Sequence, residues 1–267
     1  MNEKTSWSRD QLLIAFKLYC QMPFGKMHSR NPKIIKYANL INRTPSALAM
    51  KLTNIASLDP SITSTGRRGL TGASSTDRAM WTEMKNDWDT FILEIYDAEK
   101  KFGISNDLNE INKTEKHISD SETLVDYTGK NKLSEINARI GQNFFRKSVL
   151  SAYNSKCCIT GLSIPQLLIA SHIIPWSTDN KNRLNPRNGL CLSIIHDKAF
   201  DMGIITLSEK YSVKVAEDYL LETFLLDNFF VATIIEYEGK SINLPEKFVP
   251  EQEFLNYHRA QIFKGKI

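Results

Sequence analysis

Long apolar runs are absent from this sequence of 267 residues. The longest, LLIA and the interrupted FLLDNFFVATII, are too short to cross a bilayer, and the opening MNEKTSWSRD contains no apolar signal core. These absences argue against a membrane span and against a secretory signal. We therefore expect a cytoplasmic protein.

A CxxC pair is also absent, and no internal repeat appears. The two adjacent cysteines are a poor basis for a disulfide framework, which is typical of a protein from a reducing compartment. A structural zinc ribbon is therefore not expected. The pattern favours packed thiols at all four cysteines, which are Cys20, Cys157, Cys158 and Cys191.

The residues that are present have the balance of a globular protein, with 42% hydrophobic and 24% charged side chains. The length allows one large domain or two modest ones, each with an ordinary core. The formal net charge of +4 permits a polyanionic partner such as nucleic acid but does not require one.

The first sixty residues have the periodicity of packed helices. Ser8 and Gln11 have capping-box spacing before an apolar helical stripe, and an Asn-Pro pair and a Thr-Pro pair predict the starts of a second and a third helix. Only two residues separate these later helices, as in a helix-turn-helix that presents its last helix to DNA. A plain three-helix packing unit explains the periodicity equally well. In the DNA-binding alternative, the outward side chains are Arg43, Ser46, Lys51 and Asn54.

A basic loop is expected after these helices. Between residues 59 and 75 the composition shifts to Ser, Thr and Gly around Arg67 and Arg68. We expect both arginines, together with Arg43 and Lys51, to contact DNA.

A single longer helix is predicted from about residue 77 to 102, because its apolar residues recur at helical spacing. The next segment, 104–135, is polar, poor in aromatics and mixed in charge, which predicts a linker. The expected domains are therefore a helical domain over 1–103 and a second domain over 136–267.

Polar groups gather in segment 167–203. LLIASHIIPW and GLCLS predict two strands, which STDNKNRLNPRN connects and a short helix, IIHDKAFD, follows. This order can bring His172, Asn188 and the pair His196-Asp197 to one point, and Gly203 should end the helix. A histidine can take a proton from water, and a histidine with a carboxylate can hold a divalent cation. Hydrolysis of a phosphodiester needs both a group that takes the proton from water and a cation that neutralises the phosphate.

The residues SHI-PW, NPRNGL-LS and HDKAFD-GI, with the upstream FRKSVLSAYNSKCCITGL, are similar to the HNH endonuclease family. The likeness is to the branch often attached to restriction-type nucleases and covers roughly residues 138–205, with weaker likeness as far as NYHR. The segment that begins WSRDQLLIAF resembles a module found before such nucleases in bacterial proteins. The resemblance implies a ββα-metal nuclease site.

Carried over by position, the resemblance assigns three roles. His172 corresponds to the general base that activates water. Asn188 corresponds to the residue whose hydrogen bonds fix the loop and orient that base. His196 corresponds to the metal ligand on the helix.

One position departs from the family pattern. Many HNH enzymes have Asp or His directly before the base as a further metal ligand, whereas this sequence has Ser171. Asp197, or Asp201 one helical turn later, could supply the missing carboxylate, and we prefer Asp197 because Asp201 could equally brace the helix. The implied cofactor is a divalent metal ion, Mg²⁺ or Mn²⁺, with Zn²⁺ or Ni²⁺ as alternatives.

These observations predict an α+β protein with a helical, helix-turn-helix-like amino-terminal domain and a carboxyl-terminal ββα-metal HNH domain. The expected activity is metal-dependent cleavage of double-stranded DNA in restriction or anti-phage defence. A homodimer is a candidate assembly, because double-strand cutters with one site per chain commonly act as dimers. Two alternatives stay open: an inactive DNA-binding regulator of the same fold, which Ser171 favours, and an RNase.

Overall fold

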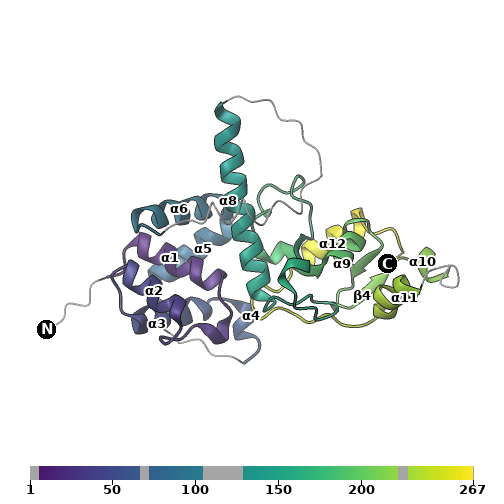
Figure 1. Cartoon of the computed structure of the whole chain (residues 1–267), viewed down its shortest axis with the longest axis horizontal. Coiled ribbons are helices and arrows are strands. Elements are labelled where there is room, and N and C mark those ends of the chain that lie inside the picture. Colours follow the sequence, from purple (N-terminus) through teal and green to yellow (C-terminus); the bar gives the residue numbers. More distant parts are fainter. Residues whose placement is uncertain (1–5, 67–71, 105–128, 222–227, 267) are drawn as a thin grey trace. The chain divides into compact units, whose positions relative to one another are not determined.

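The computed structural model describes residues 6–66, 72–104, 129–221 and 228–266 (Figure 1). The chain divides into two units, Met1–Phe145 and Arg146–Ile267, and the point of division lies inside helix α8 (Gly129–Ala152). Most of the predicted linker lies outside the described residues, as do Arg67 and Arg68, so the domain limits and those two DNA contacts stay predictions. Helices and antiparallel strands are both present, and the predicted α+β class is confirmed.

Local sequence determines where the first helices begin. Ser8 Oγ accepts a hydrogen bond from Gln11 N, and Gln11 Oε1 accepts one from Ser8 N, so the predicted capping box is confirmed. Asn31 and Thr44 cap the next two helices, each of which begins with proline. Asn42 makes the turn between them at φ 54°, a left-handed conformation that asparagine tolerates.

The first unit contains the following helices within its described residues: α1 (Arg9–Cys20), α2 (Pro32–Leu40), α3 (Pro45–Ala56), α4 (Pro60–Thr63), α5 (Ser75–Asn86) and α6 (Trp88–Lys101), with a 3-10 turn at Phe24–Lys26. The single helix expected over 77–102 is thus two helices. Asp87 has an extended backbone, with φ −148° and ψ 89°, and its side chain accepts a hydrogen bond from Thr90 N at 3.0 Å. It ends α5 and caps α6, while the apolar spacing continues across the break.

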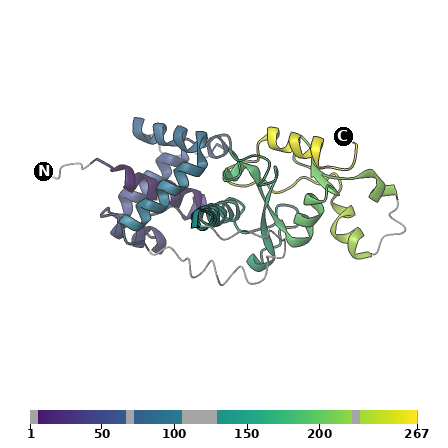
Figure 2. The same ribbon diagram turned by 90° about the horizontal axis from the view of Figure 1, so that it is seen from above.

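Helix α1 forms the centre of the first unit's core. It packs against α3 and α6, and eight of its twelve residues are buried (Figure 2). The ring of Phe16 lies edge-on to Phe91, with centroids 5.6 Å apart, and 6.5 Å from the ring of Trp81. These aromatic contacts join α1 to α5 and α6, which are distant from it in sequence.

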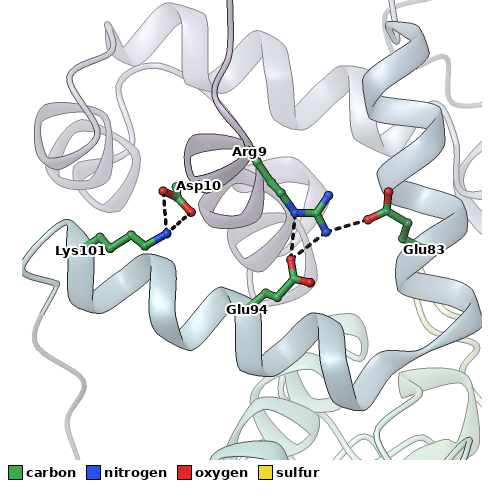
Figure 3. A network of polar contacts seen from close by, with 5 residues as sticks. All are labelled: Arg9, Asp10, Glu83, Glu94 and Lys101. Carbon is green, nitrogen blue, oxygen red and sulfur yellow. Dashed lines mark hydrogen bonds and ion pairs between the residues drawn. The ribbon is translucent and has the colours of Figure 1, made fainter.

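Ion pairs also join α1 to α5 and α6 (Figure 3). Arg9 contacts Glu83 and Glu94, each at 2.7 Å, and Lys101 contacts Asp10 at 3.0 Å. The hydrogen bonds to Glu83 and then Glu94 raise the pKa of Arg9. Because exposed pairs each contribute only about 0–1 kcal/mol, the apolar core carries most of this unit's stability.

Among its described residues, the second unit contains two antiparallel hairpins, and helix α9 connects the first hairpin to the second. Helix α9 also packs on both strands of the first hairpin. The predicted order of strand, loop, strand and helix is confirmed. The elements are β1 (Leu168–His172), β2 (Gly189–Ser193), α9 (Ile194–Asp201), β3 (Ile205–Leu207), β4 (Val213–Val215), α10 (Glu217–Leu221), α11 (Asn228–Thr233), α12 (Gln252–Gln261), and 3-10 turns at Pro165–Leu167, Pro186–Asn188 and Ile235–Tyr237.

Gly203 ends α9, as the sequence predicts. Its φ is 71°, and a β carbon at this position would overlap the carbonyl oxygen of Ile262. Lys264 N donates a hydrogen bond to Gly203 O at 3.0 Å. Only glycine fits where the segment after α12 closes on the end of α9.

All four cysteines are buried, and no disulfide links them in the described structure. The helices of the described ranges include none that is long and apolar enough to cross a membrane.

Candidate active site

The first hairpin positions two neighbouring side chains, Ser171 and His172, at the end of β1. His172 is the last residue of β1 and pairs with Gly189 at the start of β2. The two side chains differ in burial. Ser171 is 3% exposed, whereas His172 is half-buried.

A hydrogen bond fixes the tautomer of His172. Its Nε2 lies 2.9 Å from the carbonyl oxygen of Arg183. A carbonyl only accepts, so Nε2 carries the proton and the lone pair is on Nδ1. Burial lowers the pKa of His172, and the hydrogen bond to Arg183 opposes this effect. The ring is therefore neutral near pH 7, with Nδ1 as its basic nitrogen.

Asn188 holds the loop between β1 and β2. The residue is completely buried, and its Oδ1 accepts a hydrogen bond from Ile174 N at 2.8 Å. Its Nδ2 donates to Ile174 O at 3.2 Å and to Asn182 O at 3.3 Å. Asn182 directly precedes Arg183, so the Asn188 amide secures the segment whose carbonyl contacts His172.

The ring of His196, the expected metal ligand, makes hydrogen bonds within the protein. The residue is 3% exposed, its Nδ1 lies 2.7 Å from Ser193 Oγ, and its Nε2 donates to Thr233 O at 2.9 Å. Both ring nitrogens are therefore occupied, and the Tyr237 ring packs edge-on to the imidazole. A metal ion could bind either nitrogen only by displacing one of these bonds. The structure gives His196 a place in the core of the second unit.

Asp197, the next residue on α9, has different surroundings from His196. Burial raises the pKa of Asp197, while the nearby Ser171 hydroxyl and Lys198 ammonium oppose the rise. One turn later, burial and the negative charge of Asp197 raise the pKa of Asp201 to about 6. The Ser171 hydroxyl is buried and makes no hydrogen bond of ordinary geometry.

The Asp197 carboxyl thus lies near the Ser171 hydroxyl and near the Asp201 carboxyl, and Asp201 is exposed to solvent. Oxygen groups of this kind suit hard divalent cations, which commonly use one or two protein carboxylates and complete their shell with water and phosphate. Among the described residues, no group of three or more His, Cys, Asp or Glu side chains has metal-binding geometry.

In the first unit, Lys51 is not on the solvent face where it was expected. It is 8% exposed, and its Nζ lies 2.8 and 2.9 Å from the two carboxylate oxygens of Asp77. Arg43 is half-buried, contacts Gln11 Oε1 through Nε and Nη2, and lies 4.8 Å from the centre of the Trp7 ring. Both cations therefore hold the helices together.

Ser46 and Asn54 are the other two side chains that were expected to face DNA. Ser46 is exposed, and Asn54 is half-buried. Asn54 Oδ1 is itself buried and has no hydrogen-bond partner, so this side chain faces partly into the unit.

The hairpin and helix of the second unit match a known family model. The match covers residues 157–208, and the model describes an HNH endonuclease. The second unit contains an HNH endonuclease domain. The predicted resemblance is confirmed over the matched residues, and the HNH domain includes His172, Asn188, His196 and Asp197.

A comparison with solved structures finds chains that resemble part of this protein. One match is described as the modification-dependent TagI restriction endonuclease, with a TM-score of 0.31 and 17% sequence identity over 44% of this chain. The aligned region spans 37% of the TagI chain. No curated protein matched in the sequence comparison.

Arg183 is the residue of the HNH domain that sequence reasoning did not find. The connecting loop contains three cations, Lys181, Arg183 and Arg187, and no spacing rule distinguishes them. In the structure Arg187 contacts Val249 O at 3.2 Å and Glu251 at 3.7 Å, whereas the Arg183 carbonyl contacts His172. Only the fold of the loop distinguishes Arg183 from the other two cations.

Proposed function

We propose that the protein is a metal-dependent endonuclease that hydrolyses phosphodiester bonds in double-stranded DNA. One observation carries this proposal: the bond from His172 Nε2 to Arg183 O leaves Nδ1 as the basic nitrogen. Nδ1 takes a proton from a water molecule, and the hydroxide attacks phosphorus. Asn188 acts on the reaction through the loop that orients the base.

A divalent metal ion, Mg²⁺ or Mn²⁺, suits the oxygen groups of α9 and β1. The buried Ser171 hydroxyl near the Asp197 carboxyl supports this assignment, as do the two carboxyl groups one helical turn apart. We propose Asp197 as the protein ligand, with Ser171 and Asp201 beside it, in place of the His196 ring. When bound, the ion supplies positive charge that stabilises the phosphate and the leaving 3′ oxygen.

The biological setting follows from the family and is part of the proposal. HNH endonucleases act on nucleic acid, and a helical unit ahead of the nuclease suits restriction or anti-phage defence in the cytoplasm. Cleavage of both strands with one site per chain would require two chains, which makes a homodimer the expected assembly. The helical unit serves DNA recognition through surfaces other than Lys51, because that side chain is buried.

A second candidate is a DNA-binding regulator that keeps the fold without cleavage. The specific observation that favours it is Ser171, whose neutral hydroxyl stands where many HNH enzymes have an ionised or imidazole ligand. An RNase of the same fold is a further alternative, since the hydrolytic groups act on the phosphate and not on the sugar.

One cleavage assay separates these functions. Purified protein is incubated with methylated plasmid, unmethylated plasmid and RNA, each with Mg²⁺, Mn²⁺ or EDTA, and His172→Ala is the control for contaminating nucleases. We expect metal-dependent DNA cleavage that His172→Ala lacks. Cleavage of RNA alone would assign an RNase, and binding of DNA without cleavage under every metal condition would assign the regulator.

A further inference from the structure

The loop between β1 and β2 places a cation next to the proposed base. The guanidinium carbon of Arg183 lies 5.0 Å from the centre of the Trp176 ring. The same ring lies edge-on to His172, with centroids 5.6 Å apart. Arg183 therefore contacts the base through its carbonyl, and its side chain reaches the ring that also packs against the base.

Hydrogen bonds within the loop hold this arrangement. Asp179 Oδ1 accepts from Lys181 N at 3.0 Å and from Asn182 N at 3.1 Å, and Asp179 Oδ2 accepts from Asn182 Nδ2 at 2.7 Å. Asn182 O in turn accepts from the Asn188 amide. The residue before Arg183 is thus fixed at both its amide and its carbonyl, which limits movement of the arginine backbone.

Arginine has the chemistry to use such a position. Its guanidinium is always charged, packs over aromatic rings and presents five N–H donors at its edge, so it can keep a contact within the protein and still bind a phosphate oxygen. The pair of Trp176 and Arg183 is half-buried, which reduces screening of the charge by solvent. Lys181, two residues away, is exposed and provides a natural comparison.

We propose that Arg183 is a substrate-binding residue whose guanidinium, held over Trp176, binds a non-bridging oxygen of the DNA phosphate at the scissile bond. This inference rests on the proposed nuclease function and adds a role to the same site. The carbonyl of Arg183 orients the base while its side chain orients the phosphate, so one residue sets the position of the attacking water relative to phosphorus.

The test compares Arg183→Ala, Arg183→Lys and the matched control Lys181→Ala in the full chain. Cleavage is measured as kcat/KM on plasmid DNA, and binding to a short duplex is measured at several salt concentrations in the His172→Ala background. We expect Arg183→Ala to lower kcat/KM by about 100-fold, the loss seen when a single transition-state donor is removed. Its salt slope of binding should fall by roughly one unit, as expected for one lost phosphate contact.

Arg183→Lys keeps the charge but loses the planar fork, so an intermediate loss of about 10-fold is expected. Lys181→Ala should change kcat/KM less than about 3-fold, because its ammonium is exposed and screened. Thermal melts of each variant show whether the loop is intact. If Arg183→Ala is too unstable to assay, Arg183→Lys decides the question through kcat/KM alone, because a variant that keeps the charge should keep the salt slope.

Equal kcat/KM and equal salt slopes for the Arg183 and Lys181 variants would overturn the inference. The proposed nuclease function would stand in that case, provided that His172→Ala has lost cleavage. If His172→Ala cleaves like the wild type, the proposed function fails first, and that result is distinguishable from the failure of Arg183 alone.

Discussion

The helical unit and the HNH domain differ in the partners of their buried charged groups. In the helical unit, Lys51 pairs with both oxygens of Asp77, and Lys17 pairs with Glu99. In the HNH domain, burial raises the pKa of Asp197, and the nearby Ser171 hydroxyl and Lys198 ammonium oppose this rise.

This difference separates charges that hold a fold from charges that are available for chemistry. A buried polar group normally has a partner, and an unsatisfied one costs free energy unless a ligand compensates. Perturbed pKa values that arise without a compensating partner are typical of functional sites. Arg43 and Lys51, which were first assigned to DNA binding, thus belong to the first class, and the carboxyls of α9 belong to the second.

The largest effect that we expect is on catalysis in the HNH domain. His172→Ala should lower kcat/KM about 10³-fold, because it removes the only basic nitrogen that the hairpin presents in the proposed mechanism. Duplex binding and the melting temperature should change little. The exposed His28 of the helical unit is the control, and His28→Ala should cleave like the wild type. Equal cleavage by His172→Ala and His28→Ala would show that His172 is not the general base.

A comparable effect on stability is expected in the helical unit. Lys51→Met leaves the Asp77 carboxylate buried without its cation, which should cost about 3–5 kcal/mol in urea unfolding. The control is Lys36→Met, which removes an exposed lysine of α2 and should be nearly neutral. A Lys51→Met variant of unchanged stability that binds DNA weakly would return Lys51 to a recognition role.

The HNH domain should also respond to pH through a structural histidine. Burial lowers the pKa of His258 to about 4, although its hydrogen bond to Phe200 opposes this effect. The unfolded chain, with a histidine pKa of about 6.5, binds the proton more readily between these values. Stability is thus fully present above pH 6.5 and should fall by about 3 kcal/mol as the pH drops to 4.

Urea unfolding of the wild type and His258→Asn at several pH values measures this dependence. The difference in unfolding free energy between them should shrink as the pH falls from 6.5 to 4. A constant difference across that range would show that His258 does not titrate on unfolding.

Metal affinity gives the smallest effect and tests the two residues of α9 against each other. Asp197→Asn should weaken Mn²⁺ binding by about 10–100-fold in calorimetry, because it removes the proposed carboxylate ligand. His196→Asn should leave that affinity within about twofold and instead lower stability by about 1–3 kcal/mol, since it disrupts buried hydrogen bonds. The reverse result would make His196 the ligand.

Features that depend on neighbours in the chain were predictable from sequence. The capping box at Ser8 and the glycine at position 203 both follow from local backbone chemistry. The strand order of the HNH domain followed from its alternation and turn residues. The break at Asp87 was missed, because a capping aspartate inside a continuous apolar stripe leaves the helical period unchanged.

Features that depend on distant partners were not predictable. Lys51 lies three residues after Leu48 and four before Ile55, on the buried stripe of α3, but Asp77 is 26 residues away. His196 and Asp197 are adjacent, and each helical residue turns by about 100°, so the two side chains meet different surroundings. Only packing of α9 on the hairpin decides which of them approaches Ser171.

The contacts of residues 258–264 with the end of α9 determine when the site can be completed during synthesis. His258 Nε2 donates to Phe200 O at 3.1 Å, and Lys264 N donates to Gly203 O, so residues made late secure the helix that carries Asp197. The strand with His172 leaves the ribosome well before them. If the domain cuts DNA, we expect cleavage to begin only after residues 258–264 have been made and have closed on α9.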